Sequence, residues 1–274
     1  MKKKNILIPV LTVVFAGLFL FSAWKLWGIR SEYRKSGSTY GELTQAVVST
    51  PEPTPAQKPE ETEEEEVEVY VPWPSVDFTQ LNEINTDVVG WLQIGGTIID
   101  YPVVQGRDNW YYLEHLITGE PAIAGCLMLD CANESDFSDP NSVIYAHHMQ
   151  NGTLFGQLEN YRKEGFFEEH PYAYLLTPEK NYVVRFFAGV LTTYDAQAWN
   201  LHLEGEVREE WLRFAKANSS FDSPVTPAKE DRILTLSTCS NDGRDLRYVM
   251  LGVLEAEGEI RPDFVPMEWK DDEE

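Results

Sequence analysis

A single thiol at the end of a strand-like run carries the chemistry that this sequence suggests most strongly. Residues 233–239, Ile-Leu-Thr-Leu-Ser-Thr-Cys, are apolar and β-branched, and a turn-forming Ser-Asn-Asp-Gly stretch follows them. Cys239 therefore lies at a predicted strand end, where a thiol can reach a ligand. His147 could add a base or acid, and Arg247 could add a fixed cation. Together these groups could attack a peptide carbonyl and hold the acyl group as a thioester.

None of these residues is specific by itself. A single cysteine is most often a buried, small apolar residue, and a lone histidine or arginine is usually structural. The order His–Cys–Arg, with each residue inside a local pattern, favours a shared site. Two neighbours remain alternatives. His148 would face the opposite side of an extended chain from His147, and Arg244 lies in the turn after Cys239.

Short strand-like segments surround these residues. Apolar and β-branched runs between turn signals predict strands at 125–130, 142–146, 173–176, 182–192, 232–238 and 247–254. A hairpin is predicted around Gly95-Gly96, with Trp91-Leu92 on one arm and residues 97–99 on the other. Many short strands of this kind favour a mainly β fold, a closed barrel of about eight strands, over a βαβ fold.

Peripheral helices are expected at three places. The first covers residues 78–84, where apolar side chains have helical spacing. The second would follow a cap at Thr153. The third covers residues 206–217, where four residues form an apolar stripe: Val207, Trp211, Phe214 and Ala215.

The N-terminus predicts one transmembrane helix. Residues 6–24 are uncharged and mostly apolar, and at ~1.5 Å per residue they would span about 28 Å, close to the ~30 Å hydrocarbon core. A cleaved signal peptide fits less well, because the bulky Phe21 stands where cleavage needs a small residue. Basic residues flank both ends of the span, so charge alone does not set its orientation. The acidic bulk of the chain favours residues 1–5 in the cytoplasm and the remainder outside the cell.

Residues 25–74 are expected to connect this anchor to a folded domain. The sequence loses periodicity between Ser36 and Pro74, where Pro-rich and Glu-rich runs cannot form a core. We expect a stalk here that holds the domain, residues 75–262, away from the membrane. Residues 263–274 form an acidic tail for which no structure is expected.

Composition limits the partners and cofactors. The net charge is −23 although residues 1–35 are basic, so nucleic acid is not an expected partner. Cys126 and Cys131 would point to opposite faces of one strand, so a free Cys239 with two packing cysteines is expected. No metal or other cofactor is expected, since the remaining histidines are scattered: His115, His170 and His202.

Three motifs surround the candidate residues: Tyr-Ala-His-His-Met at 145–149, Leu-Ser-Thr-Cys at 236–239 and Arg-Tyr-Val at 247–249. In this order and spacing they resemble the sortases, and class B sortases in particular. The resemblance covers most of the chain from Phe78 to Glu259. Further matching segments lie at 84–85, 87–92, 97–106, 108–109 and 112–113. A helix inserted before the cysteine strand also fits that class.

The resemblance implies a cysteine transpeptidase. Cys239 would be the nucleophile, His147 rather than His148 the acid or base, and Arg247 rather than Arg244 the cation that stabilises developing charge. Four more positions match residues with which the family contacts its sorting peptide: Asn109, Leu113, Tyr145 and Ser237.

The implied reaction is cleavage of a C-terminal sorting motif after threonine, followed by acyl transfer to an amine. The partners would be surface proteins that carry the motif, and a peptidoglycan precursor or a pilin that supplies the amine. The enzyme would be a single-pass membrane protein with its catalytic domain outside the cell.

Other classes are less consistent with the sequence. In papain-like and similar cell-wall peptidases the cysteine precedes the histidine, and here the order is reversed. An L,D-transpeptidase has a Ser-His-Gly-Cys run, whereas this chain has Leu-Ser-Thr-Cys. A non-enzymatic membrane-anchored surface domain would have no need of a thiol at a strand end.

Overall fold

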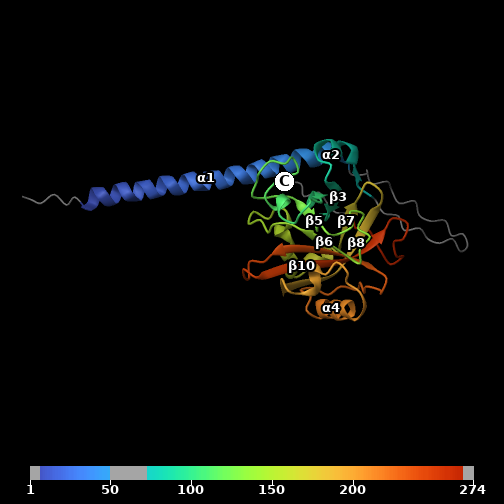
Figure 1. The fold of residues 1–274 in the computed structure, drawn as a ribbon. Coiled ribbons are helices and arrows are strands. Elements are labelled where there is room, and N and C mark those ends of the chain that lie inside the picture. Colours follow the sequence, from blue (N-terminus) through green and yellow to red (C-terminus); the bar gives the residue numbers. More distant parts are fainter. Residues whose placement is uncertain (1–6, 50–72, 268–274) are drawn as a thin grey trace, which may run out of the picture.

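The computed structural model describes residues 7–49 and 73–267. A long N-terminal helix projects from a β-barrel that carries shorter helices on its outside (Figure 1). The Glu-rich run at residues 60–68, predicted to be part of a stalk, lies outside the described residues.

The barrel is closed by eight strands in the order β10-β8-β7-β3-β4-β5-β6-β9. Neighbouring strands are antiparallel except for the pairs β4–β5 and β6–β9. The predicted mainly β, closed-barrel fold is confirmed. The strands are β3 (Val88–Gln93), β4 (Asp100–Val104), β5 (Leu127–Leu129), β6 (Asn141–Tyr145), β7 (Tyr172–Leu176), β8 (Asn181–Thr193), β9 (Arg232–Cys239) and β10 (Leu246–Ala256).

One wall of the barrel is buried on both faces. Strands β8, β9 and β10 pack their inner side chains into the main core, while a second apolar cluster covers their outer side. Helix α4 (Gly205–Ala217) supplies Trp211 and Ala215 to that second cluster. This is why β9 is buried along nearly its whole length, including its threonines and Ser237, and is exposed only at Cys239.

The α4 stripe differs from the prediction. Val207 and Phe214 are 45% and 47% exposed, whereas Arg208 is buried. The helix therefore turns the face of Arg208, Trp211 and Ala215 toward the barrel, at i, i+3 and i+7.

Two further local predictions need correction. The predicted hairpin around Gly95-Gly96 is present as β3–β4, but residues 97–99 belong to its turn rather than to its second strand, and the Thr97 hydroxyl donates to the carbonyl of Ile94 at 2.7 Å. The predicted cap at Thr153 is wrong, because its hydroxyl donates instead to Asn151 Oδ1 at 2.8 Å. The helix that follows is the 3-10 helix η2 (Phe155–Arg162).

The other short helices lie in the connections between strands. The predicted helix at 78–84 is present as α2 (Phe78–Ile84), capped by Asp77, whose carboxylate accepts from the Gln80 amide. The remaining ones are η1 (Tyr111–Leu113), α3 (Phe166–Glu169) and η3 (Gln197–Trp199).

The N-terminal helix α1 (Leu7–Val47) continues far beyond the predicted membrane span. Its last turns bury Tyr40, Leu43 and Val47 against the barrel, and the Tyr40 hydroxyl donates to the carbonyl of Gly125 at 2.6 Å. The expectation that periodicity is lost from Ser36 is therefore wrong for residues 36–47. Two short strands follow and pair with each other: β1 (Val48–Ser49) and β2 (Ser75–Val76).

The C-terminal segment is ordered further than predicted. Asp263 accepts two hydrogen bonds from Arg185, at 2.8 and 2.9 Å. Phe264 is buried, and the Met267 amide donates to the Tyr172 hydroxyl at 2.8 Å. The structureless tail predicted from 263 therefore packs on the barrel as far as residue 267.

All three cysteines are free. Cys126 is buried as expected, and burial raises the pKa of its thiol to about 12. Cys131 is exposed, so the prediction of two packing cysteines holds only for Cys126.

Candidate active site

The parallel pair β6–β9 places His147 beside Cys239. Parallel strands end at the same edge of a sheet, and Tyr145 is the register partner of Ser237. Two residues further along each chain stand His147 and Cys239, so the two side chains leave the same barrel edge on the same face. The register of β6 and β9 continues past Tyr145, because the Ala146 amide donates to the Ser237 carbonyl at 3.2 Å and the Thr238 hydroxyl donates to the Ala146 carbonyl at 2.9 Å.

The antiparallel neighbour β10 adds the arginine. Arg247 is the register partner of Cys239, so the two side chains stand on the same face of the sheet. His147, Cys239 and Arg247 thus form one row across three strands that are adjacent in the barrel but far apart in sequence. Neither His148 nor Arg244 belongs to this row.

An open cleft of about 350 Å³ lies at the row. The structure brings all seven predicted site residues to its walls, and their roles in the reaction stay predictions. They are Asn109, Leu113, Tyr145, His147, Ser237, Cys239 and Arg247.

His147 has one ring nitrogen fixed. Its Nε2 lies 2.9 Å from the Leu113 carbonyl oxygen, which can only accept, so this hydrogen bond assigns the hydrogen to Nε2. In the neutral ring Nδ1 is then the nitrogen that can take up a proton. The half-buried imidazole is oriented by the backbone of η1 on one side of the cleft.

His148 faces a different environment. Its Nε2 lies 3.5 Å from Glu159 Oε2, on helix η2. The same carboxylate accepts from the hydroxyl of Ser240, directly after Cys239. His148 is therefore part of a polar brace behind the β9–β10 turn, which Arg162 extends by pairing with Asp242 at 2.7 Å.

Arg247 is held through its own loop. Its Nη1 donates to the carbonyls of Arg244 and Leu246, at 3.1 and 3.0 Å. Among the described residues only this nitrogen of the guanidinium has a hydrogen-bond partner, which leaves Nε and Nη2 for a ligand. Arg244 contributes its backbone carbonyl to this arrangement, while its side chain is exposed.

Asp130 orients two of the candidate peptide-binding residues. This buried carboxylate accepts from the Tyr145 hydroxyl at 2.8 Å and from Asn109 Nδ2 at 2.9 Å. The side-chain oxygen of Asn109, Oδ1, accepts from the Cys131 backbone amide, so both the oxygen and the nitrogen of this side chain are fixed. Burial, and then the negative charge of Asp130, raises the pKa of Tyr145, which keeps its hydroxyl protonated as a donor.

Sequence reasoning missed four residues of the cleft that lie outside the three motifs, and it missed the carboxylate behind the cleft. Trp199 donates from Nε1 to the Ser237 hydroxyl at 3.2 Å and so fixes that candidate contact. Trp110, directly after Asn109, could have been found as an aromatic neighbour of a matched residue. Asp130 carries no signal beyond its place at a strand end. The four missed cleft residues are Trp110, Met128, Tyr194 and Trp199.

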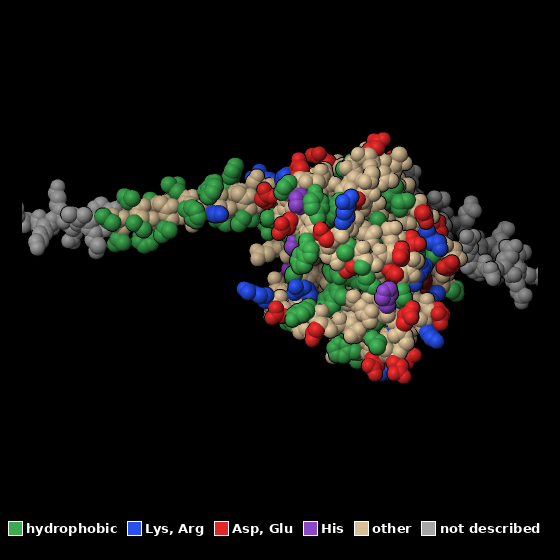
Figure 2. Space-filling model, in the orientation of Figure 1, with side chains coloured by type: hydrophobic (Ala, Val, Ile, Leu, Met, Phe, Trp, Pro, Cys, Tyr) green, Lys and Arg blue, Asp and Glu red, His purple; other side chains and the backbone are tan. Residues whose placement is uncertain are grey.

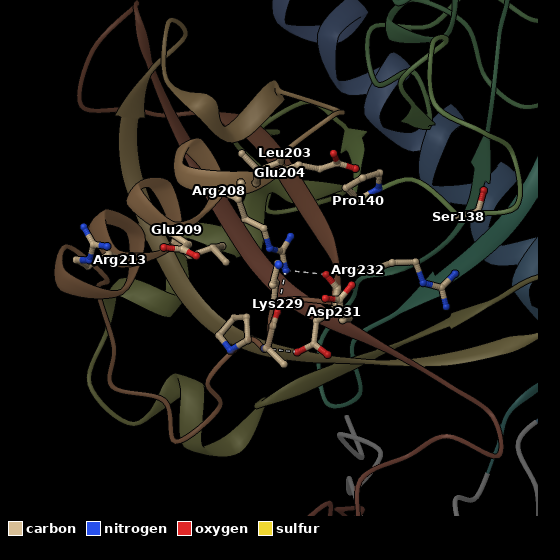
Figure 3. A pocket seen from close by; sticks show the side chains of 15 residues that line it. Ser138, Pro140, Leu203, Glu204, Arg208, Glu209, Arg213, Lys229, Asp231 and Arg232 are labelled. Carbon is tan, nitrogen blue, oxygen red and sulfur yellow. Dashed lines mark hydrogen bonds between the residues drawn. The ribbon is translucent and has the colours of Figure 1, made fainter.

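A larger hollow of about 870 Å³ lies at the other end of β9, under α4. Buried Arg208 points into it and donates to the carbonyls of Ala228 and Asp231, as Figure 3 shows. Charges of both signs line it, and it contains none of the predicted site residues. Across the described part of the chain, no group of His, Cys, Asp and Glu side chains could hold a metal ion.

No family model matches the chain. A curated relative does: sortase B of Listeria monocytogenes is 35% identical over 247 residues, which cover 88% of this chain and 93% of that protein. The chain belongs to the class B sortases. Sortase B of Staphylococcus aureus is also similar, 33% identical over 60% of this chain and 68% of that protein.

Solved class B sortases share the barrel. A Staphylococcus aureus sortase B–substrate complex matches with a TM-score of 0.61 and 31% identity, over 65% of this chain and 83% of that one. A Bacillus anthracis sortase B in complex with AAEK2 matches with a TM-score of 0.65 and 27% identity, over 81% and 96%. The class B sortase described here is therefore a cysteine transpeptidase.

Proposed function

We propose that this sortase cleaves a C-terminal sorting motif after threonine, through a thioester on Cys239, and transfers the acyl group to an amine of a cell-wall precursor or a pilin. The observation that carries the proposal is the row of His147, Cys239 and Arg247 in one open cleft. Such a row offers a nucleophile, a proton carrier and a fixed cation to a single carbonyl group.

The first half-reaction breaks the peptide bond. The Cys239 sulfur attacks the threonine carbonyl carbon, and its proton passes to His147. Arg247 donates to the carbonyl oxygen while negative charge develops there. The carbon–nitrogen bond then breaks, and His147 returns its proton to the departing amine, so a thioester and a free amine result.

The second half-reaction uses the acceptor amine. Its nitrogen attacks the thioester carbonyl carbon, again with Arg247 donating to the oxygen. The carbon–sulfur bond breaks, and the proton lost by the amine passes through His147 to the Cys239 sulfur. The enzyme is restored, and the overall change exchanges one amide for another.

Asn109, Leu113, Tyr145 and Ser237 are proposed to bind the motif. They line the same cleft and present amide, hydroxyl and apolar groups to an extended peptide. One solved relative is described as a sortase B–substrate complex and another as sortase B complexed with triglycine, a peptide that carries a terminal amine. These complexes support a peptide donor and an amine acceptor for this chain.

We also propose a single-pass membrane location with the catalytic domain outside the cell. One helix near the N-terminus is long and apolar enough to cross a membrane, and its span is not buried against the barrel. Hydrophobic side chains cover the projecting part of α1 in Figure 2.

The proposal is tested with a panel of sorting peptides and a triglycine acceptor. The purified protein should release the segment after threonine and join the remainder to the acceptor, as read by mass spectrometry of the products. The Cys239→Ala variant should fold and yield neither product. Cleavage retained in that variant would remove Cys239 from the reaction.

A further inference from the structure

The acidic segment between β1 and β2 cannot act as a stalk. Val48 pairs with Val76 and Ser49 pairs with Ser75, so the chain leaves and returns at the same place on the barrel. Whatever path residues 50–72 take, they add no distance between the membrane and the domain. The connection to the membrane is α1 alone.

The part of α1 between the predicted membrane span and the barrel is short and continuously helical. From Trp24, at the end of the predicted span, to Lys35 the rise is about 16 Å at ~1.5 Å per residue. Lys35 already touches the barrel: its Nζ lies 2.9 Å from Glu120 Oε2 and 3.5 Å from the Pro121 carbonyl oxygen. The headgroup layer itself occupies about 5–8 Å on each side of the hydrocarbon core.

The loop that α1 contacts is also the loop that forms the cleft. Residues 109–126 contain Glu120, which pairs with Lys35, and Leu113, whose carbonyl holds His147. Figure 1 shows the green loops of this region on the side of the barrel from which α1 projects. A loop that lines the active-site cleft therefore lies on the side of the domain from which α1 projects.

This side exposes apolar groups. Trp110, Tyr111 and Ile123 are 76%, 45% and 49% exposed. Aromatic residues of this kind are enriched at the level of lipid headgroups, where a ring can contact both apolar and polar groups. The exposed bases Lys25 and Arg30 lie on α1 between the span and the barrel, and would be attracted to anionic lipid.

We propose that residues 110–123 face the outer surface of the lipid bilayer, with the side chains of Trp110, Tyr111 and Ile123 directed toward the headgroup layer and α1 as the strut that sets this height. The inference rests on the proposed membrane anchor. The cleft then accepts a sorting motif that lies close to the membrane, because a rigid helix holds the cleft at that level.

The contact is measured with the full-length protein in vesicles of phosphatidylcholine and phosphatidylglycerol. An environment-sensitive fluorophore is attached at Ile123→Cys, and separately at Glu209→Cys on the far-side helix α4, with Cys131 and Cys239 replaced by Ala. Brominated lipids should quench the label at 123 and leave the label at 209 unaffected. Equal emission and quenching at both positions would overturn the proposal.

The strut is tested by inserting one heptad of helix-forming residues after Ile29, which raises the domain by about 10 Å with about 20° of rotation. Turnover of a membrane-tethered substrate should fall about tenfold or more, because a mismatched tether lowers the effective concentration steeply. The same heptad inserted after Glu60, between β1 and β2, is the control and should change nothing.

Turnover of a soluble sorting peptide separates the two claims. If the unmodified protein converts neither soluble nor tethered peptide, the proposed function fails. If soluble peptide is converted normally and the heptad after Ile29 leaves tethered turnover unchanged, only the membrane contact is wrong.

Discussion

His147 and His148 are sequence neighbours with different surroundings, and their substitution separates chemistry from support. His147→Ala removes the ring that lines the cleft, so kcat/KM should fall by ~10²–10⁴-fold, the usual effect of losing a positioned acid or base. His148→Ala removes one partner of Glu159 behind the turn and should cost far less activity. Kinetics of both variants on one peptide decide the assignment, and the reverse ranking would move the proton carrier to His148.

Arg247 and Arg244 give a second matched pair. Arg247→Lys keeps the charge but loses the planar guanidinium with its paired donors. If one donor to the developing oxyanion is lost, the activation free energy should rise by about 2.7–4 kcal/mol and kcat should fall accordingly. Arg244 serves through its backbone carbonyl, so Arg244→Lys should be nearly silent. A near-normal Arg247→Lys enzyme would show that the cation acts elsewhere.

Asp130 is expected to control peptide binding without touching the reacting atoms. In Asp130, Oδ2 accepts from Tyr145 and Asn109, and Oδ1 accepts from the Ala132 amide. An asparagine has only one side-chain oxygen, so in Asp130→Asn its NH₂ group would face the donors on one of these two sides. A buried unpaired group costs ~1–3 kcal/mol, so KM should rise about tenfold while kcat stays within about twofold. The exposed Asp222→Asn is the control. A fall in kcat with unchanged KM would contradict this role.

At the residue scale, pattern and resemblance predicted residues that the fold brings into one cleft, because the key members stand at strand ends. Cys239 was visible as the last residue of an apolar run before a turn. Asp130 was not visible, since its importance comes from two hydrogen bonds across strands that no local pattern encodes. Trp199 was missed for the same reason, because its contact with Ser237 joins distant segments.

At the scale of elements, α1 is part of the folded domain as well as the proposed anchor. Leu43→Ala should lower the free energy of unfolding by about 2–5 kcal/mol, because the side chain is buried against the barrel. Glu42→Ala, on the exposed side of the same turn, should have little effect. Denaturant unfolding of a fragment that begins at Glu32 measures both. Equal stability of the two variants would mean that this end of α1 does not pack on the barrel in solution.

The sequence contains a helical pattern in the last turns of α1, but few of the residues there are apolar, so the pattern is weak. Ser36, Tyr40, Leu43 and Val47 recur at i, i+4, i+7 and i+11, the spacing of a buried helical stripe. The nearby Pro- and Glu-rich runs suggested a break earlier than the one that occurs. The strands were easier to predict, since β-branched runs between turns are typical of strands. The buried face of α4 was predicted wrongly, because Arg208 stands where an apolar residue is expected in its buried stripe.

At the scale of the whole molecule, the pairing of β1 with β2 predicts that the acidic segment is dispensable for catalysis. Replacing residues 50–72 by a short Gly-Ser loop should keep the Ser49–Ser75 pair, and it retains Trp73, which packs against Tyr174, and the buried Pro74. The shortened protein should fold, with an unchanged melting temperature and kcat/KM on a soluble peptide. Loss of activity with a retained fold would assign the segment a part in substrate binding.

Cys239 is predicted to form the acyl-enzyme, and Cys131 provides a control within the same chain. Cys131 is also an exposed free thiol, but partial burial and then the charges of Asp130 and Asp108 raise its pKa, which lowers its thiolate fraction. The decisive measurement is mass spectrometry of the protein after incubation with a sorting peptide and no acceptor amine, with digestion to locate the added mass. The acyl group is predicted on Cys239, unchanged in Cys131→Ala and absent in Cys239→Ala. An adduct on Cys131, or one that persists in Cys239→Ala, would contradict the account.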